Sequence, residues 1–460
     1  MGNGPPLRID IASVLGTPFS RMAKKQDIRS SLAKRLPFFY GWVIVAAAFV
    51  GAFAGGGLQS FTFSVFMKPM SESLGWTRVT LTGALTVRTY AGAVLAPVFG
   101  VLVDKHGPRY LMVFAAIVGG VAAVLISRVQ EIWQFYVIFA LVGLAGGTGV
   151  GGVITQATVV KWFVRLRGRA VAFSTMGNSA AGFVLAPLIG VVIVAIGWRS
   201  GWLILAAIFF FILIPIAFLM ARQPEDMGLL PDGAKSEEEM QTVYHQRSGR
   251  ESMYSWTLKE ALRTKALWIL LVAQIIGGFP VSSVVLHEYS YVTDSGFSTA
   301  IAAAVLSTHA AAASIARLVW GFLVERFHVR YCLAASNLGA VLGIGILLFA
   351  LNIGSTPMLF VFALVYGLNI GSHGVLTTVA TANYFGRDFI GTIRGVLAPI
   401  TTASVALGPV MVSLVYDVRG TYFPAFAAML AMFFISAVVV LFATPPTKET
   451  PVETTPVPTG

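Results

Sequence analysis

Twelve long apolar runs dominate the chain, and each is close to the length that a helix needs to cross a bilayer. Such a helix requires about 20 mostly apolar residues. Charged residues make up only 11% of the 460 residues, against about 25% in soluble domains. A surface so poor in charge suits lipid, so we predict an all-α integral membrane fold with twelve transmembrane helices. The runs lie near residues 40–66, 79–103, 110–127, 133–160, 170–196, 200–220, 266–292, 299–324, 331–352, 357–383, 391–416 and 422–443.

A polar stretch separates the sixth run from the seventh and contains the acidic cluster Glu237-Glu238-Glu239. We interpret it as a linker, which gives the chain five predicted regions. These are an N-terminal segment (1–37), an N-terminal six-helix bundle (38–220), the linker (221–265), a C-terminal six-helix bundle (266–444) and a tail (445–460). The tail is rich in proline and threonine, a composition typical of disordered segments.

The distribution of basic residues predicts the orientation of the chain. With both termini on one side, 25 of the 32 Lys and Arg residues fall on that side, and 5 fall on the other. Cytoplasmic loops carry such an excess, so we expect cytoplasmic termini, a cytoplasmic linker and tail, and a location in the cell membrane. This bias also explains the net charge of +12 without a nucleic-acid partner. The two basic residues left over, Arg88 and Arg317, fall inside predicted spans.

An internal repeat relates the two halves. The segment 100–109, GVLVDKHGPR, matches 321–330, GFLVERFHVR, at an offset of 221 residues. A second pair of matches, Trp162-Phe163 with Tyr384-Phe385 and Ala186-Pro187 with Gly408-Pro409, has an offset of 222 residues. Two pairs at nearly one offset indicate a tandem duplication, and thus two pseudo-symmetric bundles.

The segment 100–109 resembles the loop signature of the major facilitator superfamily at every defining position. This resemblance implies a membrane transporter in which the solute site lies between the halves. Asp104 lies at the cytoplasmic end of the second span, where a nearby basic residue such as Arg109 or Arg169 is expected to pair with it. We predict a conformational latch made of Asp104, Arg109 and the repeat-related Glu325 and Arg330. The alternative is that the motif only sets topology.

Two further segments are similar to motifs of the monocarboxylate and oxalate/formate porter families. They are YGWVIV at 40–45 and WFVRLR at 162–167. Arg317 takes the place of the arginine in the eighth span of monocarboxylate porters. The acidic residue four positions earlier is replaced by Ala313, and residues 397–409 lack the lysine of oxalate porters. The proton route and substrate of those families therefore do not carry over directly.

Arg88 and Arg317 are the predicted substrate-binding residues. An arginine at the centre of a bilayer costs about 2.5–3.5 kcal/mol on insertion scales, so its presence there needs a reason. The planar guanidinium suits a carboxylate, which points to an anionic substrate. The alternative is a structural arginine satisfied by helix carbonyls or by a buried acid.

Three titratable residues within the spans are candidates for proton coupling: His309, His373 and Glu288. A coupled proton needs a group that titrates near physiological pH, as histidine does. His309 ranks first, because it lies two turns before Arg317 and corresponds to Arg88 in the repeat. A hydrogen-bonded structural histidine is an equally good interpretation of each.

Other polar residues of the spans are candidates for substrate contact. Gln156, Asn178 and Asn369 either bind substrate or hold helices together, and Tyr90 and Tyr366 are weaker candidates. The single cysteine, Cys332, excludes an internal disulfide and any cysteine-based metal site.

The function expected from these features is secondary active transport of a small organic anion, a monocarboxylate, by proton symport or anion exchange. No metal or cofactor motif supports an enzyme, and no phosphate-binding loop supports ATP hydrolysis. We expect a monomer in the lipid bilayer, with a proton or counter-anion as the coupled partner. The alternatives are an exporter of hydrophobic compounds, a nitrate-like inorganic anion porter, and a receptor or scaffold that does not transport.

Overall fold

The computed structural model describes residues 33, 35–58, 60–143, 152–236, 238–239 and 255–447. Most of the predicted N-terminal segment, most of the linker after residue 239 and the tail after residue 447 lie outside these ranges. Every regular element within them is a helix. Nine helices of this part are long and apolar enough to cross a membrane, and two shorter helices, Gly41–Gly56 and Ile132–Val142, are also apolar.

The helices of the N-terminal half follow the order of the predicted spans. Its elements are α3 (Gly41–Gly56), α4 (Ser60–Leu74), α5 (Arg78–His106), α6 (Pro108–Ile126), α7 (Ile132–Val142), α8 (Val153–Trp162), α9 (Arg167–Ile196), α10 (Trp198–Ala207), a π-helical segment (Ile208–Leu213) and α11 (Ile214–Ala217). The first predicted span is divided into α3 and α4. The fourth contains α7 and α8, and residues 144–151 between them lie outside the described ranges. The sixth changes its helical pitch at Ile208.

The C-terminal half contains longer continuous helices. After a short helix of the linker, α13 (Leu258–Ala261), come α14 (Lys265–Asp294), α15 (Thr299–Arg326), α16 (Val329–Ile353), α17 (Thr356–Ile370), α18 (His373–Phe385), α19 (Ile390–Arg419) and α20 (Phe423–Leu441). The tenth predicted span is divided into α17 and α18 at Gly371-Ser372. Here the Ser372 hydroxyl donates a hydrogen bond to the Asn369 carbonyl at 2.7 Å.

The repeated motif forms a tight corner between two helices. Gly107 has a φ of 80°, a conformation that side chains other than hydrogen disfavour. Pro108 follows as the first residue of α6, where its missing N–H has no helical partner to lose. The corner ends α5 directly after Asp104-Lys105-His106 and so holds these residues at the end of the helix. We call this end of the molecule, from which the linker also starts, the linker side, and the opposite end the far side.

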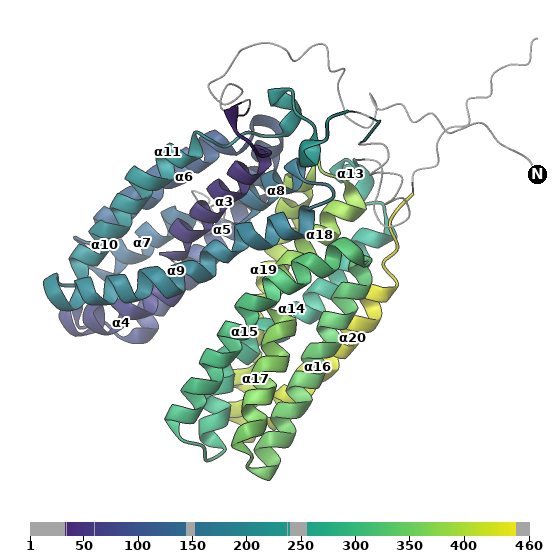
Figure 1. Ribbon diagram of the computed structural model, residues 1–460. Helices are drawn as coiled ribbons and strands as arrows, with labels where there is room; N and C mark the ends of the chain where they lie inside the picture. The colour runs from purple at the N-terminus through teal and green to yellow at the C-terminus, as the bar shows by residue number, and fades with distance from the viewer. Residues whose placement is uncertain are drawn as a thin grey trace, which may run out of the picture.

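The two halves pack against each other through α5 with α19 and through α9 with α15. In Figure 1 the purple-to-teal half and the green-to-yellow half meet near α8, α18 and α19. They diverge toward the ends that carry α4 and α10 in one half and α17 in the other. The described hydrogen bonds that join the halves all involve residues of the linker-side portions of these helices, so the molecule is closed on this side.

The buried apolar side chains form two main clusters. One cluster of buried side chains runs through the N-terminal half and continues across the linker side into the other half, where it includes Trp320, Tyr384 and Ile393. A second cluster belongs to the C-terminal half alone and is built around Tyr366 and Phe433. The linker-side contact between the halves is therefore apolar as well as polar.

Candidate solute pathway and gate

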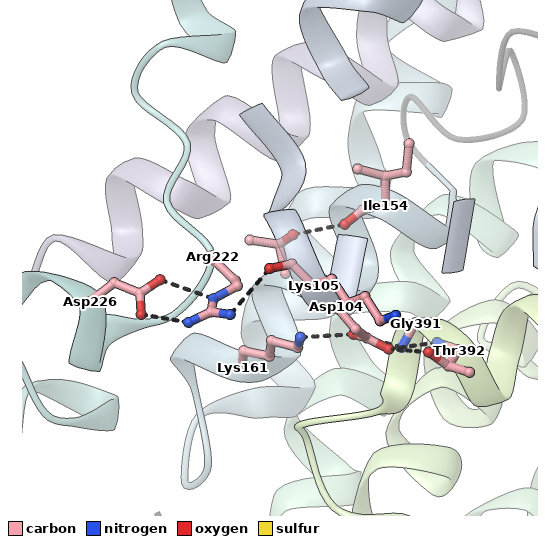
Figure 2. A network of polar contacts seen from close by, with 9 residues as sticks. Asp104, Lys105, Ile154, Lys161, Arg222, Asp226, Gly391 and Thr392 are labelled. Carbon is pink, nitrogen blue, oxygen red and sulfur yellow. Dashed lines mark hydrogen bonds and ion pairs between the residues drawn. The ribbon is translucent and has the colours of Figure 1, made fainter. Parts of the chain in front are cut away.

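Asp104 lies in the last turn of α5 and joins the two halves on the linker side (Figure 2). Its Oδ1 accepts a hydrogen bond from Lys161 Nζ at 2.7 Å, and the two side chains are only 5% and 3% exposed. From the other half, the backbone N–H groups of Gly391 and Thr392 donate to the same carboxylate at 3.2 and 2.6 Å, and the Thr392 hydroxyl donates at 2.8 Å. The first N–H groups of a helix lack partners within it, and its N-terminus attracts negative charge. Asp104 therefore caps α19.

Glu325, the repeat equivalent of Asp104, makes the corresponding contact with the N-terminal half. Its carboxylate accepts hydrogen bonds from the backbone N–H and the Nε of Arg169 at 2.9 and 2.8 Å, in the first turn of α9. We call the contacts of Asp104 and Glu325 the two carboxylate caps. The expected pairing of Asp104 with Arg169 is wrong, because Arg169 binds Glu325. The pairing with Arg109 is also wrong, because the Arg109 guanidinium lies 4.7 Å from the Phe218 ring of its own half.

Arg330 also differs from the prediction. It donates a hydrogen bond to the hydroxyl of its neighbour Tyr331 at 2.9 Å, and no described hydrogen bond or ion pair takes it to the other half. The two acidic members of the predicted latch thus lie at the contact between the halves, and the two basic members do not. Asp104 binds Lys161 and backbone N–H groups of α19 in place of the expected arginines, while Glu325 binds Arg169.

Glycines let the helices approach closely beside the carboxylate caps. A Cβ added to Gly100 would collide with the carbonyl oxygen of Gly391, and one added to Gly168 with that of Gly321. Backbone atoms cannot turn away as a flexible side chain can. The glycines that begin both copies of the repeated motif therefore permit the contact that the acidic residues complete.

Arg88 and Arg317 have different surroundings. Arg88, in α5, is 5% exposed, and one of its terminal nitrogens donates a hydrogen bond to the Leu58 carbonyl at 2.8 Å. Leu58 lies just beyond the end of α3, where the first span is divided, so this bond satisfies a carbonyl outside the regular helix. That contact favours the structural interpretation for part of the Arg88 side chain. Arg317 is half-buried near the middle of α15.

Glu288 and His309 form a buried pair between α14 and α15. His309 Nδ1 lies 2.9 Å from one carboxylate oxygen and 3.0 Å from the other, and the residues are only 1% and 3% exposed. The ring of Tyr366, from α17, lies edge-on to the imidazole at 5.1 Å between centroids, and its hydroxyl has no hydrogen-bond partner among the described residues. Two separate candidates for proton coupling are thus in direct contact.

The remaining predicted residues occupy several environments. His373 begins α18 and faces α14 beside Gly277, while the side chain of Asn369 abuts Gly339 of α16. Asn369 Nδ2 also donates to the Val365 carbonyl at 2.7 Å, which favours helix packing over substrate contact. Asn178 Oδ1 is buried and accepts no hydrogen bond from a described residue. Tyr90 is 39% exposed.

Gln156 joins α8 to two helices of the other half. Its Oε1 accepts hydrogen bonds from Thr378 Oγ1 at 2.8 Å and from an Arg394 terminal nitrogen at 2.7 Å. Sequence reasoning assigned Arg394 and Lys161 to cytoplasmic loops. The structure places Arg394 in the second turn of α19 and Lys161, 2% exposed, in the last turn of α8. The signal that was present is that Lys161 directly follows the predicted run 133–160 and Arg394 lies at the start of the run 391–416.

No group of three or more metal-binding side chains occurs among the described residues, and Cys332 is buried and unpaired with another cysteine.

Comparisons with known proteins agree with this arrangement. The model of the Major Facilitator Superfamily matches residues 47–402 and 281–459. Monocarboxylate transporter 2 of Rattus norvegicus is 22% identical over 402 residues, which is 83% of this chain and 78% of that protein. The oxalate:formate antiporter of Oxalobacter formigenes is 25% identical over 64% of this chain and 65% of that protein. An uncharacterized transporter of Bacillus subtilis is 24% identical over 40% of this chain and 45% of that protein.

Among solved structures, the proton:xylose symporter XylE bound to 6-bromo-6-deoxy-D-glucose is similar with a TM-score of 0.69. The likeness covers 88% of this chain and 96% of that one at 14% identity. It confirms the predicted twelve-helix fold, and the family match confirms the resemblance drawn from the repeated motif. The chain belongs to the major facilitator superfamily and is a membrane transporter rather than an enzyme.

Proposed function

We propose that this protein is a secondary active transporter of a small organic anion, a monocarboxylate, by proton symport or anion exchange. The observation that carries the proposal is an arginine inside a membrane-crossing helix of each half, Arg88 in α5 and Arg317 in α15. A guanidinium binds a carboxylate through two parallel charge-assisted hydrogen bonds. The names of two relatives, a monocarboxylate transporter and an oxalate:formate antiporter, support the same chemical class.

The proposed transport cycle alternates access by rocking one half against the other. In this structure the halves are held together on the linker side by the two carboxylate caps. The excess of Lys and Arg supports a cytoplasmic linker side, and this conformation is then the one closed to the cytoplasm. Separation of α19 from Asp104 and of α9 from Glu325 would open that side.

The buried pair of Glu288 and His309 is the proposed proton carrier. A carboxylate in contact with an imidazole can hold one proton between them, and a pair this deeply buried exchanges it only when a pathway opens. His309 and Arg317 belong to the same helix, α15, which supports coupling between the proton and the anion. Tyr366 from α17 is the titratable side chain that packs directly on this pair.

A screen of anions tests the proposed function. Purified protein is expected to gain thermal stability with a short-chain monocarboxylate, because a ligand at 100 times its dissociation constant stabilises the native state by about 2.7 kcal/mol. The same anion is then expected to accumulate in proteoliposomes. Flux of cationic dyes, with none of organic anions, would contradict the proposal and favour an exporter of hydrophobic compounds.

Glu288→Gln and His309→Gln are expected to abolish accumulation driven by a pH gradient while preserving anion exchange. Each removes one member of the pair that holds the proton and leaves the arginines in place. The measurement is uptake of labelled anion in proteoliposomes, with and without the gradient. His287→Gln is the matched control, because His287 Nε2 instead contacts the Pro409 carbonyl at 3.1 Å. Gradient-driven uptake at the unmodified level in both variants would exclude this pair.

A further inference from the structure

A small hydrogen-bonded cluster joins the two halves at equivalent positions of the repeat. We call it the Gln156 cluster, and its members are Gln156, Thr378 and Arg394. Gln156 belongs to α8 of one half, and the other two residues belong to α18 and α19 of the other half. Residues 156 and 378 are 222 positions apart, which is the offset of the repeat. The hydrogen bond between Gln156 and Thr378 therefore joins equivalent positions of the two halves and lies on the axis that relates them.

The Gln156 cluster lies deeper in the molecule than the carboxylate cap of Asp104. Gln156 precedes Lys161, a partner of Asp104, by five residues on α8, a rise of about 7.5 Å at 1.5 Å per residue. Arg394 likewise follows Thr392, the other partner, further into α19. The Gln156 cluster thus forms the inner layer of the linker-side closure, between the cap and the middle of the molecule.

Arg394 breaks the symmetry of this layer. Its repeat equivalent is Ala172, so the N-terminal half supplies no matching charge. In the described ranges its hydrogen bond goes to the neutral amide oxygen of Gln156, and none of the ion pairs there includes it. An amide oxygen accepts a hydrogen bond without neutralising the charge. Arg394 therefore keeps a full positive charge in a half-buried place within a membrane-crossing helix.

Opening of the linker side must break both hydrogen bonds of the cluster, because Gln156 moves with one half and its two donors with the other. Thr378 remains satisfied, because its single hydroxyl proton, which Gln156 shares with the Gly374 carbonyl of its own helix at 2.7 Å, can then be donated wholly to that carbonyl. The Arg394 guanidinium instead loses its acceptor at the moment when the pathway to the linker side opens. Water or an anionic solute must then replace it.

We propose that Arg394 is a one-sided anion-binding residue that Gln156 sequesters while the linker side is closed. When the halves separate there, Arg394 binds the carboxylate of the solute on its way to or from that side. This inference deepens the proposed function and rests on the transport of an anion. It assigns Arg394 a role on the linker side only.

The first test compares the two faces of the membrane. In vesicles of known orientation, Arg394→Gln is expected to raise the half-saturating concentration of acetate at least tenfold from the linker side and less than twofold from the far side. Arg394→Lys keeps the charge and is expected to recover part of the loss. Thr378→Val, which removes the neutral donor of the cluster, is the matched control. An equal change from both faces, or none, would overturn the inference.

The second test needs no transported solute, so its outcome is separate from that of the proposed function. Gln156→Glu places a carboxylate opposite Arg394 and is expected to lower the fraction of molecules open on the linker side at least fivefold. Adding Arg394→Gln is expected to reverse the effect.

That fraction is measured from the distance between spin labels at Lys105→Cys and Phe327→Cys, exposed positions at the linker ends of α5 and α15, in a Cys332→Ala background. An open fraction unchanged by Gln156→Glu would show that Arg394 does not engage residue 156 in the closed state, and would overturn the proposed sequestration. If Gln156→Glu lowers the open fraction as expected while no anion is transported, the contact between Arg394 and residue 156 in the closed state is supported and the proposed solute is wrong.

Discussion

Replacing Arg317 by glutamine is expected to lower the flux of the transported anion by about 100-fold. A charge-assisted hydrogen bond contributes about 1.5–3 kcal/mol, and each 1.4 kcal/mol is a factor of ten in an equilibrium. Two such bonds to one carboxylate account for the expected loss even after partial replacement by water. The measurement is initial uptake in proteoliposomes with matched protein content, checked by the elution profile of the purified protein.

The Arg317→Lys variant tests whether a positive charge is enough at this position or whether the planar guanidinium is needed. Lysine keeps the positive charge but cannot form two parallel bonds to one carboxylate, so we expect a smaller loss, of about tenfold. The structural interpretation predicts a different result, with poor folding of both variants and normal flux per folded molecule. That outcome would remove Arg317 from the substrate site and, with it, the main support for an anionic solute.

Gly100→Leu is expected to hold the linker side open and to reduce transport to below a tenth of its normal rate. The new side chain would collide with the Gly391 carbonyl, and overpacking costs about 1–3 kcal/mol or more where the surroundings cannot yield. In the open conformation α5 and α19 are apart and the collision disappears. The substitution thus destabilises the conformation closed on the linker side and leaves the stability of the open conformation unchanged.

The distance between labels at Lys105→Cys and Phe327→Cys measures this effect, which is expected as a shift of the whole distribution to longer values. Gly374→Leu is the matched control, because a Cβ at that position meets no atom within 4 Å. A Gly100→Leu protein that transports normally and closes fully would show that the approach of α5 to α19 does not limit the cycle.

The sequence predicts the fold well because membrane spans are set by apolar length and the halves by duplication. Both are local or repeated properties, and most helices fall within a few residues of the predicted runs, although α4 continues to Leu74, beyond the first run at 40–66. The interruptions of the first and tenth spans were missed, because a break of a few residues barely changes the mean hydropathy of a window.

The site was predicted in part. Asp104 and Glu325 were found through their motif, but besides the Lys161 and Arg169 side chains their partners include backbone N–H groups of α19 and α9. Every residue has such a group, so composition gives no signal for it. Glu288 and His309 were found separately, since only the packing of α14 on α15 brings them together. Arg394 was counted with the adjoining loop although it lies within the predicted run 391–416, because hydropathy does not show which residues at the end of a run belong to the helix.

The apolar cluster shared by the two halves makes the balance between the two conformations depend on temperature. Opening the linker side divides this cluster around Trp320 and Ile393 and hydrates the surfaces that separate. Hydration of apolar surface raises the heat capacity, so the free-energy difference between the two conformations curves with temperature. Because the hydrophobic contribution weakens on cooling, the apolar contact that closes the linker side would contribute less stability in a cold membrane.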